Sequence, residues 1–192
     1  KGTTMTQAHN NYTPAYRNYV LFILWLTYIL NFVDRQLINI LLEPIKTEFG
    51  ASDTAMGFLT GFAFALFYAS LGVPIARLAD RWSRRNVIAI SVGIWSAMTA
   101  ISGMASSFAQ LALARVGVGI GEAGGSPPSH SMISDFYAKE ERAGAMGVYS
   151  LGIPLGIMAA YFFTAALLGT DAESVNWRRI FIIFSLSNLG RR

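Results

Sequence analysis

The sequence contains no cysteine and only two histidines in 192 residues. The absence of cysteine excludes disulfide bonds and cysteine-based metal or redox sites, and the two histidines are too far apart to indicate a metal site by spacing. Charged residues are also scarce, at 14%, whereas hydrophobic residues make up 53%. The composition therefore predicts an integral membrane protein that carries no metal and no cofactor.

The sequence also lacks the marks of two other classes of protein. Its net charge is +4, but the basic residues fall between apolar runs instead of forming one patch, which is typical of membrane topology and not of nucleic-acid binding. It contains no nucleophile–base arrangement and no phosphate-cradling loop. We therefore expect no nucleic-acid partner and no enzymatic activity.

Long apolar runs, separated by polar or Gly/Pro-rich breaks, predict an all-α membrane protein. A polar segment, residues 1–18, precedes them, and residues 41–50 mix charges and a proline with apolar residues, as a short interfacial segment does. We expect six transmembrane helices, at residues 19–40, 54–78, 86–107, 109–132, 144–168 and 177–190.

The distribution of Lys and Arg predicts how these six spans are oriented. Ten of the fifteen basic residues fall on the side of the two termini, three fall on the other side, and Arg35 and Arg115 lie within spans. Positive residues accumulate on the cytoplasmic side of membrane proteins. We therefore expect a multi-pass protein of the cell membrane with a cytoplasmic N-terminal tail, residues 1–18.

Four charged residues lie well inside the expected spans: Asp34 and Arg35 in the first, and Arg115 and Glu122 in the fourth. A charge at this depth costs upwards of about 2.5 kcal/mol, so intramembrane charges are usually functional. Arg115 and Glu122 are seven residues apart and share one helix face. The same spacing gives the first span a polar stripe of Thr27, Asn31 and Asp34.

The first and fourth spans are equivalent if the six helices form a 3+3 inverted repeat, so their polar faces are expected to share a cavity. A carboxylate that moves between a buried environment and an arginine neighbour can bind and release a proton. Asp34 and Glu122 are therefore the candidate proton carriers. Arg35, Arg115 and Asn31 are candidate charge partners or ligands of an anionic substrate. Alternatively, the four charges form a static network that fixes packing.

Small residues and prolines also mark the fourth span. Gly117, Gly121 and Gly125 recur every four residues, and Pro127 and Pro128 follow. Such glycines let helices approach closely, and proline removes a backbone donor and permits bending. This pattern suits helices that rock against each other, and it suits close packing without motion equally well.

Residues 76–85, between the second and third spans, read ARLADRWSRR. This segment resembles the G-x-x-x-D-R/K-x-G-R/K-R/K loop of the major facilitator superfamily, with Ala76 and Ser83 in place of the two glycines. The resemblance implies a loop that latches the cytoplasmic side by contacting a second six-helix half. It assigns a gating role to four residues: Asp80, Arg81, Arg84 and Arg85. The alternative is that these arginines only determine topology.

Further motifs resemble the Spinster-like branch of this superfamily. They are NFVDR at 31–35, RVGVGIGEA at 115–123, SDFY at 134–137, ERA at 141–143 and the segment 149–156. The organic-anion symporter branch also has N-x-x-D-R and G-x-G-E-A at the corresponding places. The Spinster-like resemblance implies proton-coupled movement of a lipid-like amphiphile, and the other branch implies symport of an organic anion with a cation.

The resemblance implies that residues 19–192 form the amino-terminal six-helix bundle of a twelve-helix secondary transporter. A second six-helix half of the same polypeptide would complete it, and the two halves would work by alternating access. The expected partners are protons, membrane lipid and a small amphipathic or anionic substrate. The alternatives are an uncoupled facilitative carrier and a non-transporting receptor or scaffold with the same fold.

Overall fold

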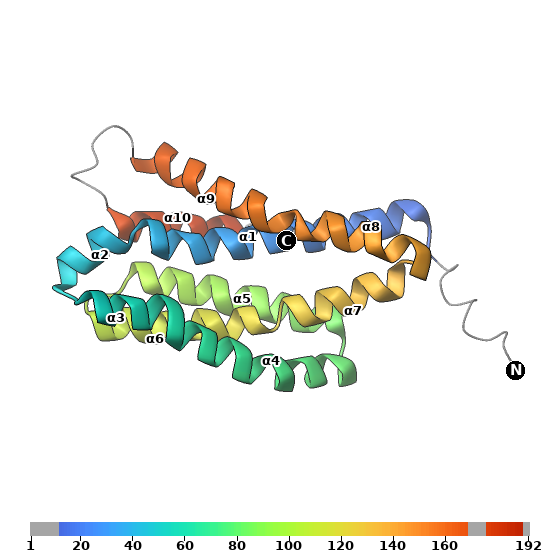
Figure 1. Cartoon of the computed structure of the whole chain (residues 1–192), viewed down its shortest axis with the longest axis horizontal. Coiled ribbons are helices and arrows are strands. Elements are labelled where there is room, and N and C mark those ends of the chain that lie inside the picture. The colour runs from blue at the N-terminus through green and yellow to red at the C-terminus, as the bar shows by residue number, and fades with distance from the viewer. Residues whose placement is uncertain (1–11, 169–175, 190–192) are drawn as a thin grey trace, which may run out of the picture.

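The computed structural model describes residues 12–168 and 176–189, and this part of the chain is helical and contains no strand (Figure 1). Besides a π-helical segment at Phe58–Ala63, it forms the α-helices α1 (Pro14–Ile40), α2 (Leu42–Phe49), α3 (Asp53–Gly57), α4 (Phe64–Arg81), α5 (Arg84–Gly103), α6 (Phe108–Ala123), α7 (Ser126–Phe136), α8 (Lys139–Ser150), α9 (Gly152–Leu168) and α10 (Trp177–Leu189).

The long helices run side by side along one axis, so that their ends gather at the two ends of the bundle (Figure 1). α1 packs along α9, α5 packs against both α6 and α10, and α4 packs against α6. By length and composition, four helical stretches in the described part can cross a membrane: Pro14–Ile40, Asp53–Ala79, Arg84–Gly103 and Lys139–Leu167. They correspond to the first, second, third and fifth expected spans.

The fourth expected span, 109–132, is not one continuous helix. α6 ends at Ala123, and α7 begins at Ser126 after a break at Gly124 and Gly125. Pro127 and Pro128 then occupy the first turn of α7. Proline is tolerated there because its missing N–H is not needed in a first turn, but it cannot continue the preceding helix. The expected fourth span therefore consists of two α-helices separated by a two-residue break.

Two other expected spans also contain local irregularities. The second span runs from Asp53 to Arg81 but includes the π-helical segment Phe58–Ala63. Pro74 lies inside α4 without ending the helix. The fifth span begins at Lys139 and turns at Leu151, between α8 and α9. Segments of π-helix are uncommon and tend to occur at functional sites.

The ends of the first and last expected spans also differ from the sequence prediction. α1 begins at Pro14, inside the expected tail, because the Thr13 side chain accepts a hydrogen bond from the Tyr16 backbone N–H and caps the helix. α10 begins at the predicted residue, Trp177, and is described as far as Leu189. The expected end of this span, at residue 190, lies outside the described residues.

The short segment after α1 forms α2, which lies at one end of the bundle (Figure 1). It ends at Gly50, whose φ of 59° places it in the left-handed region that favours glycine. Ile45 is fully buried and anchors α2 on the bundle. The predicted short segment is therefore a helix whose apolar side packs against the rest of the protein.

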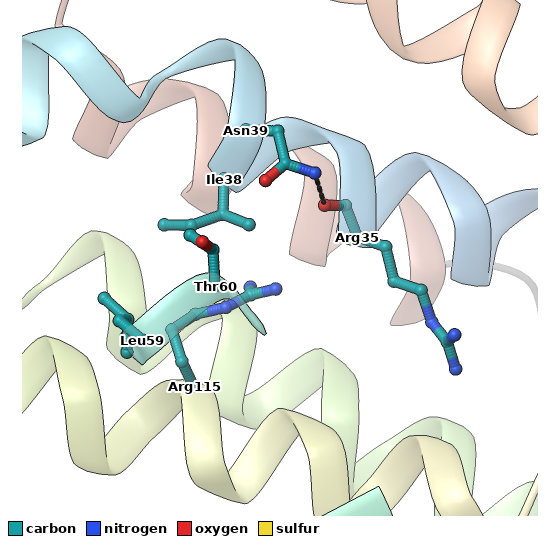
Figure 2. Close-up of a pocket in the computed structure, with 6 residues that line it drawn as sticks. All are labelled: Arg35, Ile38, Asn39, Leu59, Thr60 and Arg115. Carbon is teal, nitrogen blue, oxygen red and sulfur yellow. Dashed lines mark hydrogen bonds between the residues drawn. The ribbon is translucent and has the colours of Figure 1, made fainter. Parts of the chain in front are cut away.

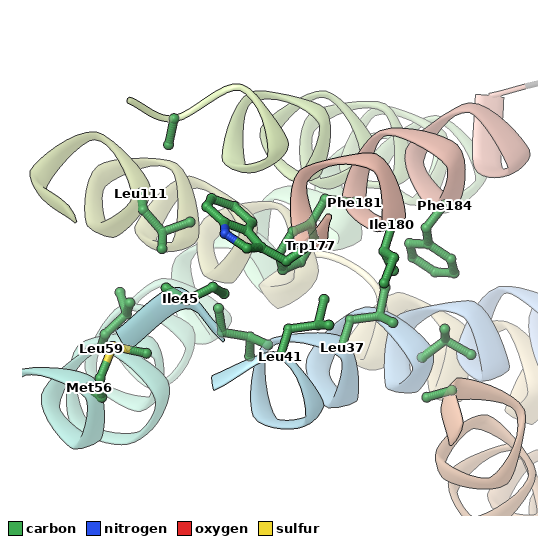
Figure 3. Close-up of a cluster of buried hydrophobic side chains, with 14 residues drawn as sticks. Leu37, Leu41, Ile45, Met56, Leu59, Leu111, Trp177, Ile180, Phe181 and Phe184 are labelled. Atoms are coloured by element: carbon green, nitrogen blue, oxygen red, sulfur yellow. The ribbon is translucent and has the colours of Figure 1, made fainter. Parts of the chain in front are cut away.

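The largest buried cluster lies at the same end of the bundle as α2 (Figure 3). Its aromatic part comes from α10, with Trp177 and Phe181, and its aliphatic part includes Leu37 from α1 and Leu59 from the π-helical segment. In a membrane bundle, such side chains stabilise the arrangement of the helices through van der Waals packing. This cluster holds α1, α10 and the π-helical segment in a fixed arrangement.

Two glycines allow neighbouring helices to approach closely. A Cβ at Gly121 of α6 would lie 2.7 Å from the Trp95 backbone nitrogen of α5. A Cβ at Gly156 of α9 would lie 2.6 Å from the Phe32 Cβ and 2.7 Å from the Ile29 carbonyl oxygen of α1. The close-packing role of these small residues is therefore present in the structure.

Candidate functional site

The first of two buried ion pairs joins α1 to α6. Asp34 is fully buried, and Arg115 is 4% exposed. Arg115 donates from one terminal nitrogen to Asp34 Oδ2 over 3.1 Å, and the Thr99 hydroxyl of α5 donates to Asp34 Oδ1 over 2.7 Å. The guanidinium carbon of Arg115 also lies 5.7 Å from the centre of the Phe181 ring. Three helices therefore meet at the Asp34 carboxylate.

The second ion pair joins the same two helices. Arg35 donates from Nε to Glu122 Oε2 over 2.6 Å, and the Glu122 side chain is fully buried. The Arg35 guanidinium carbon lies 4.7 Å from the centre of the Tyr68 ring of α4 and 5.3 Å from that of Phe32. Arg35 is the more exposed partner, with a quarter of its side chain accessible.

The two ion pairs are crossed between the helices. Each helix contributes one acid and one base, and Asp34 and Arg35 of α1 pair with Arg115 and Glu122 of α6 respectively. Each arginine thus lies beside one carboxylate, and the proton-carrying and substrate-binding roles expected of these four residues stay predictions. The spacing within α6 places Arg115 and Glu122 on one face, but they bind different partners and not each other.

Two acceptor oxygens in this region have no hydrogen-bond partner among the described residues. They are Glu122 Oε1 and Asn31 Oδ1. Asn31 is 5% exposed, so its amide is withdrawn from solvent like the four charges. A buried acceptor without a donor costs about 1–3 kcal/mol. A proton or a ligand donor that reached either oxygen would remove this free-energy cost.

The sequence analysis missed two members of the site, Thr99 and Tyr68. A signal for Thr99 exists in the sequence. Ser96, Thr99 and Ser102 recur at helical spacing in a largely apolar span, which places three hydroxyl groups on one helix face. All three are fully buried. No comparable pattern marks Tyr68, whose position beside Arg35 results from how α4 packs on α6.

A cavity of about 170 Å³ lies next to the ion pairs. Figure 2 shows that the side chains of Ile38, Thr60 and Arg115 point toward one another, whereas the Arg35 guanidinium extends away from them. The cavity is lined by Arg35, Ile38, Asn39, Leu59, Thr60 and Arg115. Arg115 is therefore the cation directed into the cavity, and the two arginines do not converge on it.

The residues of the expected gating loop lie apart from the ion pairs, at the α4–α5 connection. Arg81 ends α4 and is exposed, and Arg85 is exposed in the first turn of α5. Arg84 pairs with Asp135 of α7. Asp80 lies in the last turn of α4, and its side chain is outside the described part of the structure. The loop thus contacts the end of α7 through Arg84.

The described part of the chain shows no group of three or more His, Cys, Asp or Glu side chains arranged to hold a metal ion. Every charged member of the buried site has an opposite charge as its partner. The arrangement suits the handling of protons and anions. It offers two carboxylates, two guanidinium groups and one cavity within a single helix bundle.

Comparison with known proteins identifies the family. The family model described as the Major Facilitator Superfamily matches residues 24–189. The chain is 42% identical over 156 residues to an MFS-type efflux pump of Mycolicibacterium smegmatis, covering 80% of this chain and 35% of the pump. It is 30% identical over 162 residues to a probable L-galactonate transporter of Escherichia coli, covering 84% and 35%.

A solved structure shares both fold and sequence with this chain. It is a bacterial homologue of the human lysosomal transporter Spinster, in an inward-facing and unoccupied conformation, with a TM-score of 0.84 and 42% sequence identity. The match covers 93% of this chain and 42% of that structure. The chain thus spans well under half the length of each of these relatives. It belongs to the Major Facilitator Superfamily, as a Spinster-like member with the fold of the amino-terminal six-helix half.

Proposed function

We propose that this chain is half of a secondary active transporter that works by alternating access and is coupled to protons. The observation that carries the proposal is the pair of crossed, buried ion pairs between α1 and α6. A network of this kind that served only packing would gain little stability, because burying charges costs about as much as pairing them returns. The network joins α1 and α6, which are the first helices of the two expected three-helix repeats, and this position supports a role in transport.

Glu122 is the carboxylate best suited to carry the proton. Its Oε2 accepts from Arg35, while its Oε1 has no hydrogen-bond partner among the described residues. A proton can therefore add to Oε1 without displacing the Arg35 hydrogen bond. Asp34 differs, because Thr99 and Arg115 occupy both of its oxygens. We therefore propose Glu122 Oε1 as the position that receives the proton, with Asp34 as the second candidate carrier.

An anionic substrate accounts for the two intramembrane arginines, because guanidinium groups bind carboxylates and phosphates through several directed donors. The relatives are an efflux pump, a galactonate transporter and a Spinster homologue, so they do not indicate one substrate. We therefore propose only a substrate class for this chain: an organic anion or the anionic headgroup of an amphiphile.

The ends of the bundle support an orientation in the cell membrane with the N-terminus in the cytoplasm. Arg17 pairs with Glu141 over 2.8 Å, and Arg84 pairs with Asp135, at the end where α1, α5 and α8 begin. This is the end where basic residues accumulate. We propose that a second six-helix half contacts it through the gating loop, with Asp80, Arg81, Arg84 and Arg85 forming the latch.

The proposal is tested by reconstituting the complete polypeptide in proteoliposomes and measuring uptake of organic anions with and without an imposed pH gradient. A proton-coupled transporter accumulates substrate above equilibrium only when the gradient is present. Equal uptake in both conditions, without accumulation, would instead identify an uncoupled facilitative carrier. A protein that moves no anion in either condition, although it is folded by thermal melting, would contradict transport itself.

A further inference from the structure

The cavity beside the ion pairs lies toward the end of the bundle occupied by α2. Ile38 and Asn39 belong to the last turn of α1, and Leu59 and Thr60 belong to the π-helical segment. The Arg35 guanidinium extends away from the other lining side chains (Figure 2), and its Nε donates to Glu122. The cavity is therefore on one side of the ion network and shares Arg115 with it.

Thr60 presents an acceptor to the cavity. Its hydroxyl donates to the Met56 carbonyl oxygen over 3.0 Å, so the hydroxyl hydrogen is used within the helix. The lone pairs of Oγ1 remain available to a donor from the cavity. Figure 2 shows the Thr60 side chain directed toward α1. A ligand that meets Thr60 must therefore offer an N–H or O–H group.

Asn39 adds a second acceptor from the opposite wall. Its amide nitrogen donates to the Arg35 carbonyl oxygen over 3.3 Å, which fixes the amide orientation and leaves the Oδ1 carbonyl as an acceptor. Ile38 and Leu59 are the apolar lining residues. The cavity thus combines one guanidinium group, which donates, with two neutral oxygens, which accept.

The volume limits the size of the ligand. At about 170 Å³ the cavity is smaller than the roughly 300–1,000 Å³ of pockets that enclose drug-sized molecules. It has room for a small ligand only. The ligand chemistry that fits is an anionic group for Arg115 with a neighbouring hydroxyl group that donates to Thr60 or Asn39.

We propose that Thr60 and Asn39 form, together with Arg115, a specificity subsite that selects small anions bearing hydroxyl groups over anions without them. This inference rests on the proposed transport of organic anions and names the substrate class of the same site. It assigns function to the π-helical segment, because that irregular turn of the second span is the part that carries Thr60 into the cavity.

The test compares two six-carbon carboxylates, gluconate, which carries hydroxyl groups, and hexanoate, which carries none. Their dissociation constants are measured by titration calorimetry on the complete polypeptide in detergent. Thr60→Val removes the hydroxyl and is expected to weaken gluconate binding about three- to tenfold while leaving hexanoate binding unchanged. Thr60→Ser keeps the hydroxyl and should restore gluconate binding.

Ser129→Ala is the control. The Ser129 hydroxyl also donates to the carbonyl four residues earlier, Gly125, over 2.7 Å, but Ser129 does not line the cavity. It should leave both dissociation constants unchanged. Asn39→Leu should weaken gluconate binding in the same direction as Thr60→Val.

The inference is overturned if Thr60→Val is folded and binds gluconate as tightly as the wild type, or if the wild type binds hexanoate as well as gluconate. The first result would mean that the hydroxyl serves only the π-helical segment. Binding and transport are separable. Selective gluconate binding without any transport would support the subsite and contradict the proposed function, and gluconate transport with unaltered selectivity in Thr60→Val would do the reverse.

Discussion

Arg35 Nε and Glu122 Oε2 are 2.6 Å apart, and they join α1 to α6 at a place where the Glu122 side chain is fully buried. Seven residues before Glu122 on α6, Arg115 makes the reciprocal connection to Asp34. While both ion pairs are intact, α1 and α6 can move only together. Separating the two helices would break both ion pairs. Protonation of either carboxylate therefore changes how firmly α1 and α6 are held.

The hydrogen bond from Thr99 to Asp34 is expected to stabilise the folded protein. Thr99→Val keeps the shape of the side chain but removes the donor to Asp34 Oδ1. We expect the free energy of unfolding to fall by about 1–3 kcal/mol, because a buried carboxylate loses one of its two donors. Unfolding with SDS in mixed micelles measures this change. Thr99→Ser retains the hydroxyl, and if it is as unstable as Thr99→Val the hydrogen bond is not the cause.

Gly156 is expected to tolerate no side chain. Gly156→Ala places a Cβ 2.6 Å from the Phe32 Cβ and 2.7 Å from the Ile29 carbonyl, so α9 must move away from α1. Overpacking of this kind costs about 1–3 kcal/mol, which should appear as a lower thermal melting temperature. Gly147→Ala is the control, because nothing lies within 4 Å of its Cβ position. Equal melting temperatures for the two variants would refute the close approach.

Glu48 predicts a pH dependence of stability at the end of the bundle that carries α2. Burial alone would raise the pKa of this carboxyl, but hydrogen bonds from Arg178 and Trp177 and the Arg178 charge outweigh burial and lower the pKa below its usual 4.5. Arg178 also donates to the Ala105 carbonyl oxygen over 2.9 Å, which ties α10 to the α5–α6 connection.

A carboxyl with a lowered folded-state pKa contributes stability above its unfolded pKa and loses it as the pH falls through the folded value. The melting temperature of wild type should therefore exceed that of Glu48→Gln near neutral pH, and the difference should shrink below about pH 4.5. Melting curves of both proteins across this range measure it. A difference that stays constant with pH would show that the charge of Glu48 contributes nothing.

Orientation is tested by labelling single cysteines introduced into this cysteine-free chain. Ser83, in the α4–α5 connection, and Thr47, on α2, are both exposed and lie at opposite ends of the bundle. In intact cells an impermeant thiol reagent should label Thr47→Cys and leave Ser83→Cys unlabelled until the membrane is opened. The reverse pattern would place the N-terminus outside the cell.

The sequence was most informative where charge is rare. Four charged residues stand out because a charge in an apolar span is costly and usually functional. They are Asp34, Arg35, Arg115 and Glu122, and the structure brings all four together. Helical spacing identifies residues that share a face but not the neighbour that the face meets. The crossed pairing therefore depends on how α1 and α6 pack, which no local pattern records.

The local breaks were harder to predict. Pro127 and Pro128 were visible in the sequence, but the apolar run through them concealed the end of α6 at Ala123. The π-helical segment that carries Thr60 into the cavity has no sequence signature of its own. Its extra residue per turn is fixed by tertiary packing, including that of Leu59 in the buried cluster, so Thr60 and Asn39 could only be found in the structure.

The central claim is that protons act through Glu122, and Glu122→Gln tests it most directly. Glutamine keeps nearly the same shape and hydrogen-bonding capacity but cannot titrate. If the ion pair were only structural, the variant would leave Arg35 without its anionic partner, which costs about 3–5 kcal/mol, and melting temperature and expression would fall together. Restoration of stability by adding Arg35→Gln would identify that case.

The deciding measurement is substrate uptake into proteoliposomes that contain the complete polypeptide, with Glu122→Gln compared with wild type under an imposed pH gradient. We predict that the variant still exchanges substrate across the membrane but no longer accumulates it in response to the gradient, and that Asp34→Asn behaves in the same way. Stable Glu122→Gln and Asp34→Asn proteins that both still accumulate substrate when the gradient is imposed would contradict proton coupling through this half of the transporter.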